Sequence, residues 1–168
     1  MQALVERTSL TTEIRSGARV TAFDLTQAEK DPLLMDRRYT ENEMWENLEH
    51  WIKIIVPVAE QEGIRIGIHP CDPPVAELQG IPQLFRSFEA YKRLISIVES
   101  PSNCIEFCQG TFSEMEDAKG DGIYDMIEYF GERDKILYVH FRNVSETVPS
   151  FREEFINTGY VDMYRAMQ

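Results

Sequence analysis

Apolar and polar residues follow two alternating patterns through most of the chain. Three short apolar runs, over residues 66–69, 104–108 and 136–141, are typical of buried strands. Between them, apolar residues recur every three or four positions, which predicts helices over residues 87–99 and 123–130. Strands that alternate with helices in this way predict a parallel sheet with right-handed crossovers, and therefore an α/β fold.

A further helix precedes the first apolar run, and a capping box marks its start. The hydroxyl of Thr40 and the carboxylate of Glu43 can each satisfy a backbone amide that the first helical turn leaves free. Apolar residues follow helical spacing from there to Gly63, which is expected to end the helix. Pro57 falls inside this segment and is expected to kink the helix or to break it locally.

The remaining segments carry weaker signals. Residues 1–40 are predicted to be an irregular excursion, although residues 18–23 are a candidate fourth strand. The glycines of residues 110–122 predict a loop, and the last segment predicts a helix from about Asp162. The chain of 168 residues is therefore predicted to be a single domain, in which residues 41–168 form successive βα units.

Composition and charge narrow the choice of partners. Hydrophobic residues make up 43% of the chain and charged residues 27%, as in a folded protein with an ordinary core. The net charge of -12 argues against nucleic acid and anionic membranes, since both are bound through basic patches. No apolar run reaches membrane-spanning length, and the first residues lack the apolar core of a signal peptide. An odd number of cysteines (Cys71, Cys104 and Cys108) favours a reduced, cytoplasmic setting.

A potential metal ligand stands at or near the end of each apolar run. These residues are His69, Cys108 and His140. The carboxyl ends of parallel strands share one edge of the sheet, so the three side chains are expected to converge on a divalent metal with a position left open for substrate. Mixed nitrogen and sulfur ligands suit Zn²⁺ or Fe²⁺, and an additional carboxylate would broaden the choice towards Mn²⁺. For any one of them the alternative is a hydrogen-bonded core histidine or a small buried thiol, but the shared position favours the metal.

Two charged residues lie next to these candidate ligands. Asp72, in a proline-rich loop, can act as a general base, bind a substrate hydroxyl, orient a histidine or simply cap its loop. Arg142 can clamp a substrate carboxylate in a bidentate manner, or it can pair with Glu106 on the neighbouring strand. Residue types alone leave these alternatives open.

Several motifs together resemble the mannonate dehydratase family of the hexuronate pathway. From about Trp45 onward the order and spacing of these motifs match the family. The motifs are His69-Pro70-Cys71-Asp72-Pro73-Pro74, Phe107-Cys108-Gln109-Gly110, Val139-His140-Phe141-Arg142-Asn143-Val144 and Gly159-Tyr160-Val161-Asp162-Met163. The resemblance implies a xylose-isomerase-like (β/α)₈ barrel that dehydrates D-mannonate to 2-keto-3-deoxy-D-gluconate with Fe²⁺ or Mn²⁺.

The resemblance also implies roles for single residues. The metal ligands would be His69, Cys108 and His140. For the reaction so implied, we expect Arg142 and Asn143 to meet the substrate, and Asp72 to support acid–base catalysis or to orient another group. The sequence departs from the family at Cys71, where the family usually has an aspartate, so a carboxylate near the site is lost.

The chain is also short for the fold that the resemblance implies. An eight-stranded barrel needs roughly 250 residues, so these 168 residues are expected to be a central or C-terminal fragment with an incomplete barrel. Unpaired strand edges are then expected to favour a homodimer, and the isolated chain is expected to be nearly inactive. The alternatives are another metal-dependent sugar isomerase or epimerase of the same barrel class, against which the thiolate ligand counts, and an inactive truncated relative.

Overall fold

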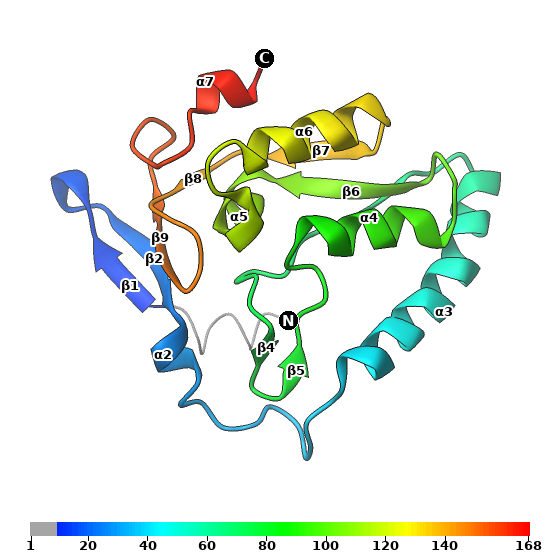
Figure 1. Cartoon of the computed structure of the whole chain (residues 1–168), viewed down its shortest axis with the longest axis horizontal. Coiled ribbons are helices and arrows are strands. Elements are labelled where there is room, and N and C mark those ends of the chain that lie inside the picture. Colours follow the sequence, from blue (N-terminus) through cyan, green and yellow to red (C-terminus); the bar gives the residue numbers. More distant parts are fainter. Residues whose placement is uncertain (1–9) are drawn as a thin grey trace.

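The computed structural model describes residues 10–168, in which two sheets and a small hairpin are joined by helices (Figure 1). In chain order the elements are β1 (Leu10–Glu13), η1 (Arg15–Gly17), β2 (Arg19–Asp24), α2 (Leu25–Ala28), α3 (Glu41–Gln61), β3 (Ile66–Ile68), β4 (Glu77–Leu78), β5 (Ile81–Pro82), α4 (Phe88–Ile97), β6 (Asn103–Cys108), α5 (Gln109–Glu114), η2 (Glu116–Ala118), α6 (Gly122–Glu132), β7 (Ile136–His140), β8 (Asn143–Val144), β9 (Ser150–Glu154) and α7 (Met163–Ala166).

The three predicted strands form one parallel sheet. Its order is β3-β6-β7, with Ile68 beside Ile105 and Cys108 beside His140. Helix α4 connects the first pair of strands, and α5 and α6 connect the second. The predicted parallel α/β sheet is thus confirmed. Within residues 10–168 the sheet is open, with β3 and β7 as its edges, and the eight-stranded barrel stays a prediction.

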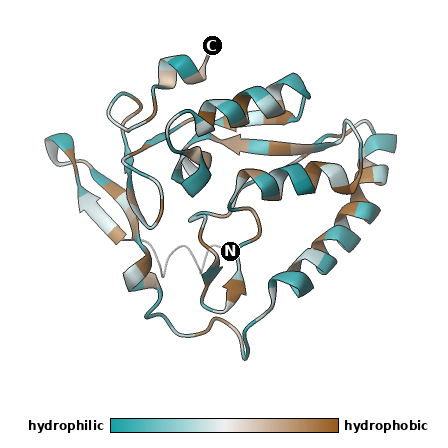
Figure 2. Cartoon of the chain, in the orientation of Figure 1, coloured by the Kyte–Doolittle hydropathy of each residue, from teal (hydrophilic) through white to brown (hydrophobic). Residues whose placement is uncertain are grey.

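The core lies between this sheet and its helices. Strand β6 is buried almost throughout, and Figure 2 shows it as a largely apolar strand beside helices with mixed faces. The ring of Phe107 stacks on Phe112 with centroids 4.2 Å apart, and the ring of Tyr91 lies 4.7 Å from Phe112. The Tyr91 hydroxyl donates to the Ile68 carbonyl. Burying each such ring stabilises the fold by about 1.5–3 kcal/mol, and together they fix α4 and α5 against the strands that carry the candidate ligands.

The helix boundaries follow the predicted signals with two exceptions. Both bonds of the Thr40–Glu43 capping box are present at the start of α3. The predicted local break at Pro57 is wrong, since α3 continues through it to Gln61 with residues on both sides buried in the core, while the alternative of a kink stays a prediction. The helix predicted over residues 123–130 runs on as α6 to Glu132, and Asp134 has the positive φ of the following turn.

A second, antiparallel sheet has the strand order β1-β2-β9-β8. The predicted irregular excursion over residues 1–40 is therefore wrong for residues 10–28, while residues 1–9 lie outside the described part of the chain. The candidate fourth strand exists as β2, but it pairs antiparallel with β1 and β9 and does not join the parallel sheet. Its partner β9 lies far along the chain, so local sequence patterns could not reveal the pairing.

Two further segments differ from the prediction. A short helix, α5, begins directly after Cys108 where a loop was expected. The proline-rich loop after His69 leads into the hairpin of β4 and β5, whose turn contains Gly80 with φ near +85°. In residues 10–168, no helix combines the length and the apolar character that crossing a membrane requires.

Candidate metal centre

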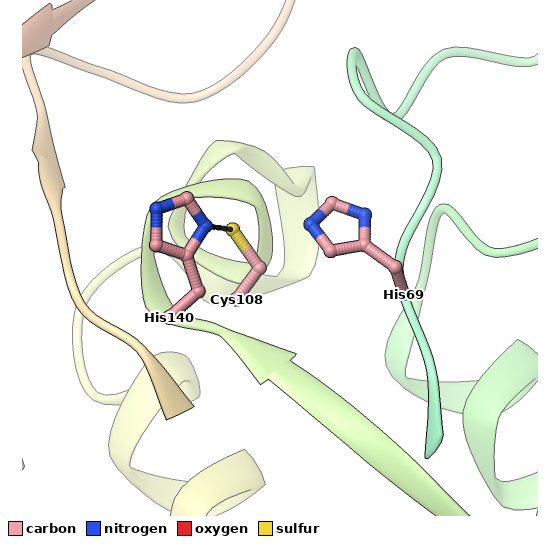
Figure 3. A group of neighbouring side chains, drawn as sticks. All are labelled: His69, Cys108 and His140. Carbon is pink, nitrogen blue, oxygen red and sulfur yellow. Dashed lines mark hydrogen bonds between the residues drawn. The ribbon is translucent and has the colours of Figure 1, made fainter. Parts of the chain in front are cut away.

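The three predicted ligands meet at the carboxyl ends of the parallel strands. His69 follows β3, Cys108 ends β6 and His140 ends β7. We call these three residues the metal trio. One ligand atom from each lies within 4.8 Å of the others, and Figure 3 shows both imidazole rings directed towards the Cys108 sulfur. The convergence follows from the topology, because successive parallel strands end at the same edge of the sheet.

A backbone contact sets the orientation of the His69 ring. Its Nδ1 lies 2.6 Å from the carbonyl oxygen of Pro70, which can only accept a hydrogen bond, so Nδ1 carries the proton. The other ring nitrogen, Nε2, then has a free lone pair and faces the sulfur (Figure 3). This is the arrangement in which a neutral histidine binds a metal. The contact with Cys108 raises the pKa of His69.

The sulfur of Cys108 is buried and lies among hydrogen-bonding groups. Its Sγ is 3.1 Å from the Thr111 hydroxyl and 3.4 Å from Nδ1 of His140. Burial by itself raises the pKa of Cys108, but the hydrogen bonds with His69 and Thr111 oppose it and bring the pKa down to about 6. The thiol is therefore easily ionised near neutral pH, and the thiolate is the form that binds metals.

The donor set fits a divalent transition metal. Two imidazole nitrogens and a thiolate are ligands shared by Zn²⁺ and Fe²⁺ sites. Tetrahedral bonds of about 2.0–2.3 Å would place the ligand atoms roughly 3.3–3.7 Å apart, so the trio, whose ligand atoms lie within 4.8 Å of one another, needs only small side-chain movements to close on an ion. The described residues offer no fourth protein ligand in this group, which leaves room at the ion for substrate or for a ligand from elsewhere.

Arg142 lies at the centre of a second group, which we call the Arg142 cluster. Its Nη2 donates to Asp72 at 2.7 Å and to Glu114 at 2.8 Å, and its Nη1 donates to Glu153. The predicted alternative of a pair with Glu106 is wrong. Arg142 lies beyond the end of β7, so its side chain crosses the end of the sheet towards α5 instead of lying beside β6.

Sequence reasoning missed Glu114, the most deeply buried member of the cluster. Its side chain is 0% exposed, and burial raises the pKa of its carboxyl group well above the ordinary value, although Arg142 opposes the shift. The glycines predict a loop over this segment, so the sequence offers no helical face that would link Cys108 to Glu114. The signal that was available is Gly110, where a Cβ atom would lie 2.2 Å from Nε of Arg142. A glycine is needed at position 110 because any larger side chain would collide with the Arg142 side chain, which passes directly over this part of α5.

Asp72 and Asn143 have partners that narrow their predicted roles. Asp72 is hydrogen-bonded to Thr111 and Arg142, so it neither caps its loop nor orients a histidine. Asn143 is fully buried, and its amide donates to the carbonyls of Ile156 and Val161 while accepting from the Val144 amide. Both ends of this side chain are thus taken up by the backbone. These bonds give Asn143 a structural role, and its predicted contact with substrate stays a prediction.

Comparisons of sequence and of structure with known proteins all point to the same family. The sequence model of the family described as D-mannonate dehydratase (UxuA) matches residues 5–168. A mannonate dehydratase of Enterococcus faecalis is 39% identical over 132 residues, which cover 77% of this chain and 35% of that protein. One of Streptococcus pneumoniae is 36% identical over 126 residues, covering 74% of this chain and 33% of that protein.

A solved structure is similar over nearly the whole chain. It is the crystal structure of mannonate dehydratase from Streptococcus suis serotype 2, with a TM-score of 0.77 and 30% identity. The match covers 94% of this chain and 46% of that one. The chain therefore spans about a third of the length of the curated relatives and less than half of the solved structure.

Proposed function

The chain belongs to the D-mannonate dehydratase (UxuA) family, and on this basis we propose that the protein acts in the dehydration of D-mannonate to 2-keto-3-deoxy-D-gluconate. Such an enzyme is a hydro-lyase, and its place would be in hexuronate catabolism. The observation that carries the proposal is the meeting of His69, Cys108 and His140 at the carboxyl end of the parallel sheet. A thiolate in the donor set argues against a sugar isomerase, since the related isomerases favour sites rich in carboxylates.

The trio is proposed to hold Fe²⁺ or Mn²⁺. A bound divalent ion would supply Lewis-acid stabilisation of the negative charge that develops beside the substrate carboxylate when the neighbouring proton is removed. The protein itself holds the ligands in the protonation states that bind a metal ion. Pro70 fixes the tautomer of His69, and the hydrogen bonds around Cys108 favour its thiolate.

The Arg142 cluster is proposed to supply the proton-transfer side of the reaction. Dehydration removes the proton from C2 and the hydroxyl group from C3, and the resulting enol becomes the ketone, so a base and an acid are both needed. Asp72 is the half-exposed carboxylate next to the trio, and Arg142 holds it in place at 2.7 Å. Asp72, Glu114 and Glu153 already accept hydrogen bonds from the Nη atoms of Arg142, so a substrate carboxylate would compete with them there or bind at Nε, which has no partner among the described residues.

We also propose that the complete protein forms the (β/α)₈ barrel implied by its family. The order of parallel strands and helices supports this, and so does edge strand β7, on which Tyr138 and Val139 are about half exposed. The same exposed edge supports the proposed homodimer. The free thiols of Cys71, Cys104 and Cys108 fit the proposed cytoplasmic setting.

The proposal is tested by measuring 2-keto-3-deoxy-D-gluconate formed from D-mannonate. The intact gene product, loaded with Mn²⁺ or Fe²⁺, is compared with its His140→Ala variant. The matched control is His50→Ala, because His50 is an exposed histidine on α3, away from the trio. We expect turnover by the wild type and the control and almost none by His140→Ala. Absence of turnover by the wild type would contradict the proposed activity.

A further inference from the structure

One hydroxyl group joins the metal trio to the Arg142 cluster. Oγ1 of Thr111 lies 3.1 Å from the Cys108 sulfur, 3.2 Å from Oδ2 of Asp72 and 3.2 Å from Nη2 of Arg142. Thr111 is on α5, three residues after Cys108, so the two side chains lie on the same face of the chain. Its side chain is fully buried, which excludes water as a competing partner.

The hydrogen-bonding capacity of a hydroxyl group limits what Thr111 can do. It has one proton to donate and two lone pairs to accept with. Arg142 can only donate, so it occupies a lone pair. The single proton then points either to the Cys108 sulfur or to the Asp72 carboxylate, and both acceptors lie within reach. The positions of sulfur and carboxylate therefore depend on the same group.

A comparison within α5 shows that these contacts are not ordinary helix contacts. Serine and threonine inside helices commonly donate to the carbonyl four residues earlier. Ser113, on the same short helix and equally buried, does this, with its hydroxyl 2.5 Å from the Gln109 carbonyl. Thr111 instead makes its contacts with side chains of the two candidate site groups.

We propose that Thr111 is a positioning residue of the site, whose hydroxyl accepts from Arg142 and donates its single proton to the Cys108 sulfur or to the Asp72 carboxylate, so that these two groups stay next to each other across it. The inference rests on the proposed function, since it takes Cys108 to be a metal ligand. It goes further by assigning the link between the metal ligand and the acid–base carboxylate to one side chain. Partners that orient metal ligands are typically worth about 10–100-fold in metal affinity.

The test uses Co²⁺ as the probe, because a cobalt–thiolate bond gives a charge-transfer absorption that reports on the sulfur directly. The purified chain and its variants are titrated with Co²⁺ alone. Thr111→Val, which keeps the shape and removes the hydroxyl, is expected to weaken Co²⁺ binding about 10–100-fold and to shift the charge-transfer band. Thr111→Ser, which restores the hydroxyl, is expected to bind within about threefold of the wild type. Ser113→Ala is the matched control on the same helix and is expected to leave the band unchanged.

The outcomes separate this inference from the proposed function. If the wild type shows no cobalt–thiolate band, the proposed metal centre fails and the role of Thr111 fails with it. If the wild type shows the band and Thr111→Val binds Co²⁺ equally well, only the role of Thr111 is overturned. If Ser113→Ala weakens Co²⁺ binding as much as Thr111→Val does, the role of Thr111 is also overturned. The effect would then come from a disturbed helix α5 and not from the Thr111 hydroxyl. Should Thr111→Val fail to fold, Thr111→Ala, which needs no more space than threonine, is judged by the same criteria.

Discussion

The metal trio and the Arg142 cluster lie next to each other at one end of the parallel sheet, yet their polar atoms are used differently. In the trio, donor atoms from three strand ends face one another within 4.8 Å. In the cluster, one guanidinium faces three carboxylates, and the ion pairs bind the members to one another. Nitrogen and sulfur donors that converge from separate strands are typical of a ligand site, whereas an arginine that donates to several carboxylates from different elements is typical of a scaffold.

The positions of the cluster members show what this scaffold connects. Asp72 follows β3, Glu114 ends α5 and Glu153 belongs to β9 of the antiparallel sheet. Arg142 thus joins the end of the parallel sheet to the second sheet. Breaking a buried ion pair by removing one partner is costly because it leaves the other charge without compensation. The difference between the two groups therefore predicts that cluster variants affect folding and trio variants affect metal binding.

The largest expected effect is on stability, from removing the cation of the cluster. Arg142→Met leaves the fully buried Glu114 without its counter-ion and is expected to lower the free energy of unfolding by about 3–5 kcal/mol. Urea denaturation measures this loss. The control is Lys53→Met, since Lys53 makes an exposed pair with Glu49 one helical turn away, Glu49 keeps Arg93 as a second partner, and the loss is expected to cost about 1 kcal/mol or less. If both variants lose the same free energy of unfolding, the Arg142 cluster contributes no more to stability than an exposed ion pair does.

The converse prediction concerns the sulfur of the trio. Cys108→Ser replaces a thiolate by a hydroxyl that stays protonated near neutral pH, so metal affinity is expected to fall more than about a hundredfold. The free energy of unfolding is expected to change by only about 1 kcal/mol. Metal titration and urea denaturation of the same samples provide both numbers. A variant that loses stability but keeps its metal affinity would reverse the assignment of the two groups.

Asn143 allows a structural role to be separated from substrate binding. Asn143→Ala leaves the Ile156 and Val161 carbonyls without their donor and is expected to lower the free energy of unfolding by about 1–3 kcal/mol. The exposed Asn42 provides the control, and Asn42→Ala is expected to change stability little. A rise in KM for D-mannonate without a loss of stability would support the predicted contact between Asn143 and substrate.

The smallest expected effect comes from a charge outside both groups. Hydrogen bonds from Arg37 and from Thr40 lower the pKa of Glu43 from 4.5 to about 2. The ionised form is therefore favoured by folding, so its contribution is present above pH 4.5 and is lost as the pH falls towards 2. Glu43→Gln is expected to flatten the pH dependence of stability in this range without changing metal affinity at pH 7. An unchanged slope would show that the cap does not contribute to acid stability.

The parallel sheet and the trio could be predicted from the sequence because their signals are local. Each strand is an apolar run, and each ligand stands at or near the end of its run, so topology alone brings His69, Cys108 and His140 together. The antiparallel sheet could not be predicted in the same way, because β2 pairs with β9 across more than half of the chain. Long-range pairing of short strands leaves little trace in local patterns.

The cluster could be predicted only in part. Asp72 and Arg142 were recognised by charge and by proximity to the ligands, but their mutual contact depends on a side chain that crosses the end of the sheet. Glu114 and Thr111 became visible only when α5 was known to begin directly after Cys108. Glycines at positions 110 and 122 suggested a loop there. At Gly110 the glycine instead makes room for the stem of Arg142.

The central claim is that His69, Cys108 and His140 form one metal centre. X-ray absorption spectroscopy at the cobalt edge of the Co²⁺-loaded chain tests it most directly, since it identifies the scattering atoms around the ion. The account predicts one sulfur and two imidazole nitrogens around each cobalt, with the sulfur lost in Cys108→Ser. A wild-type spectrum without a sulfur scatterer, or one that Cys108→Ser leaves unchanged, would contradict the claim.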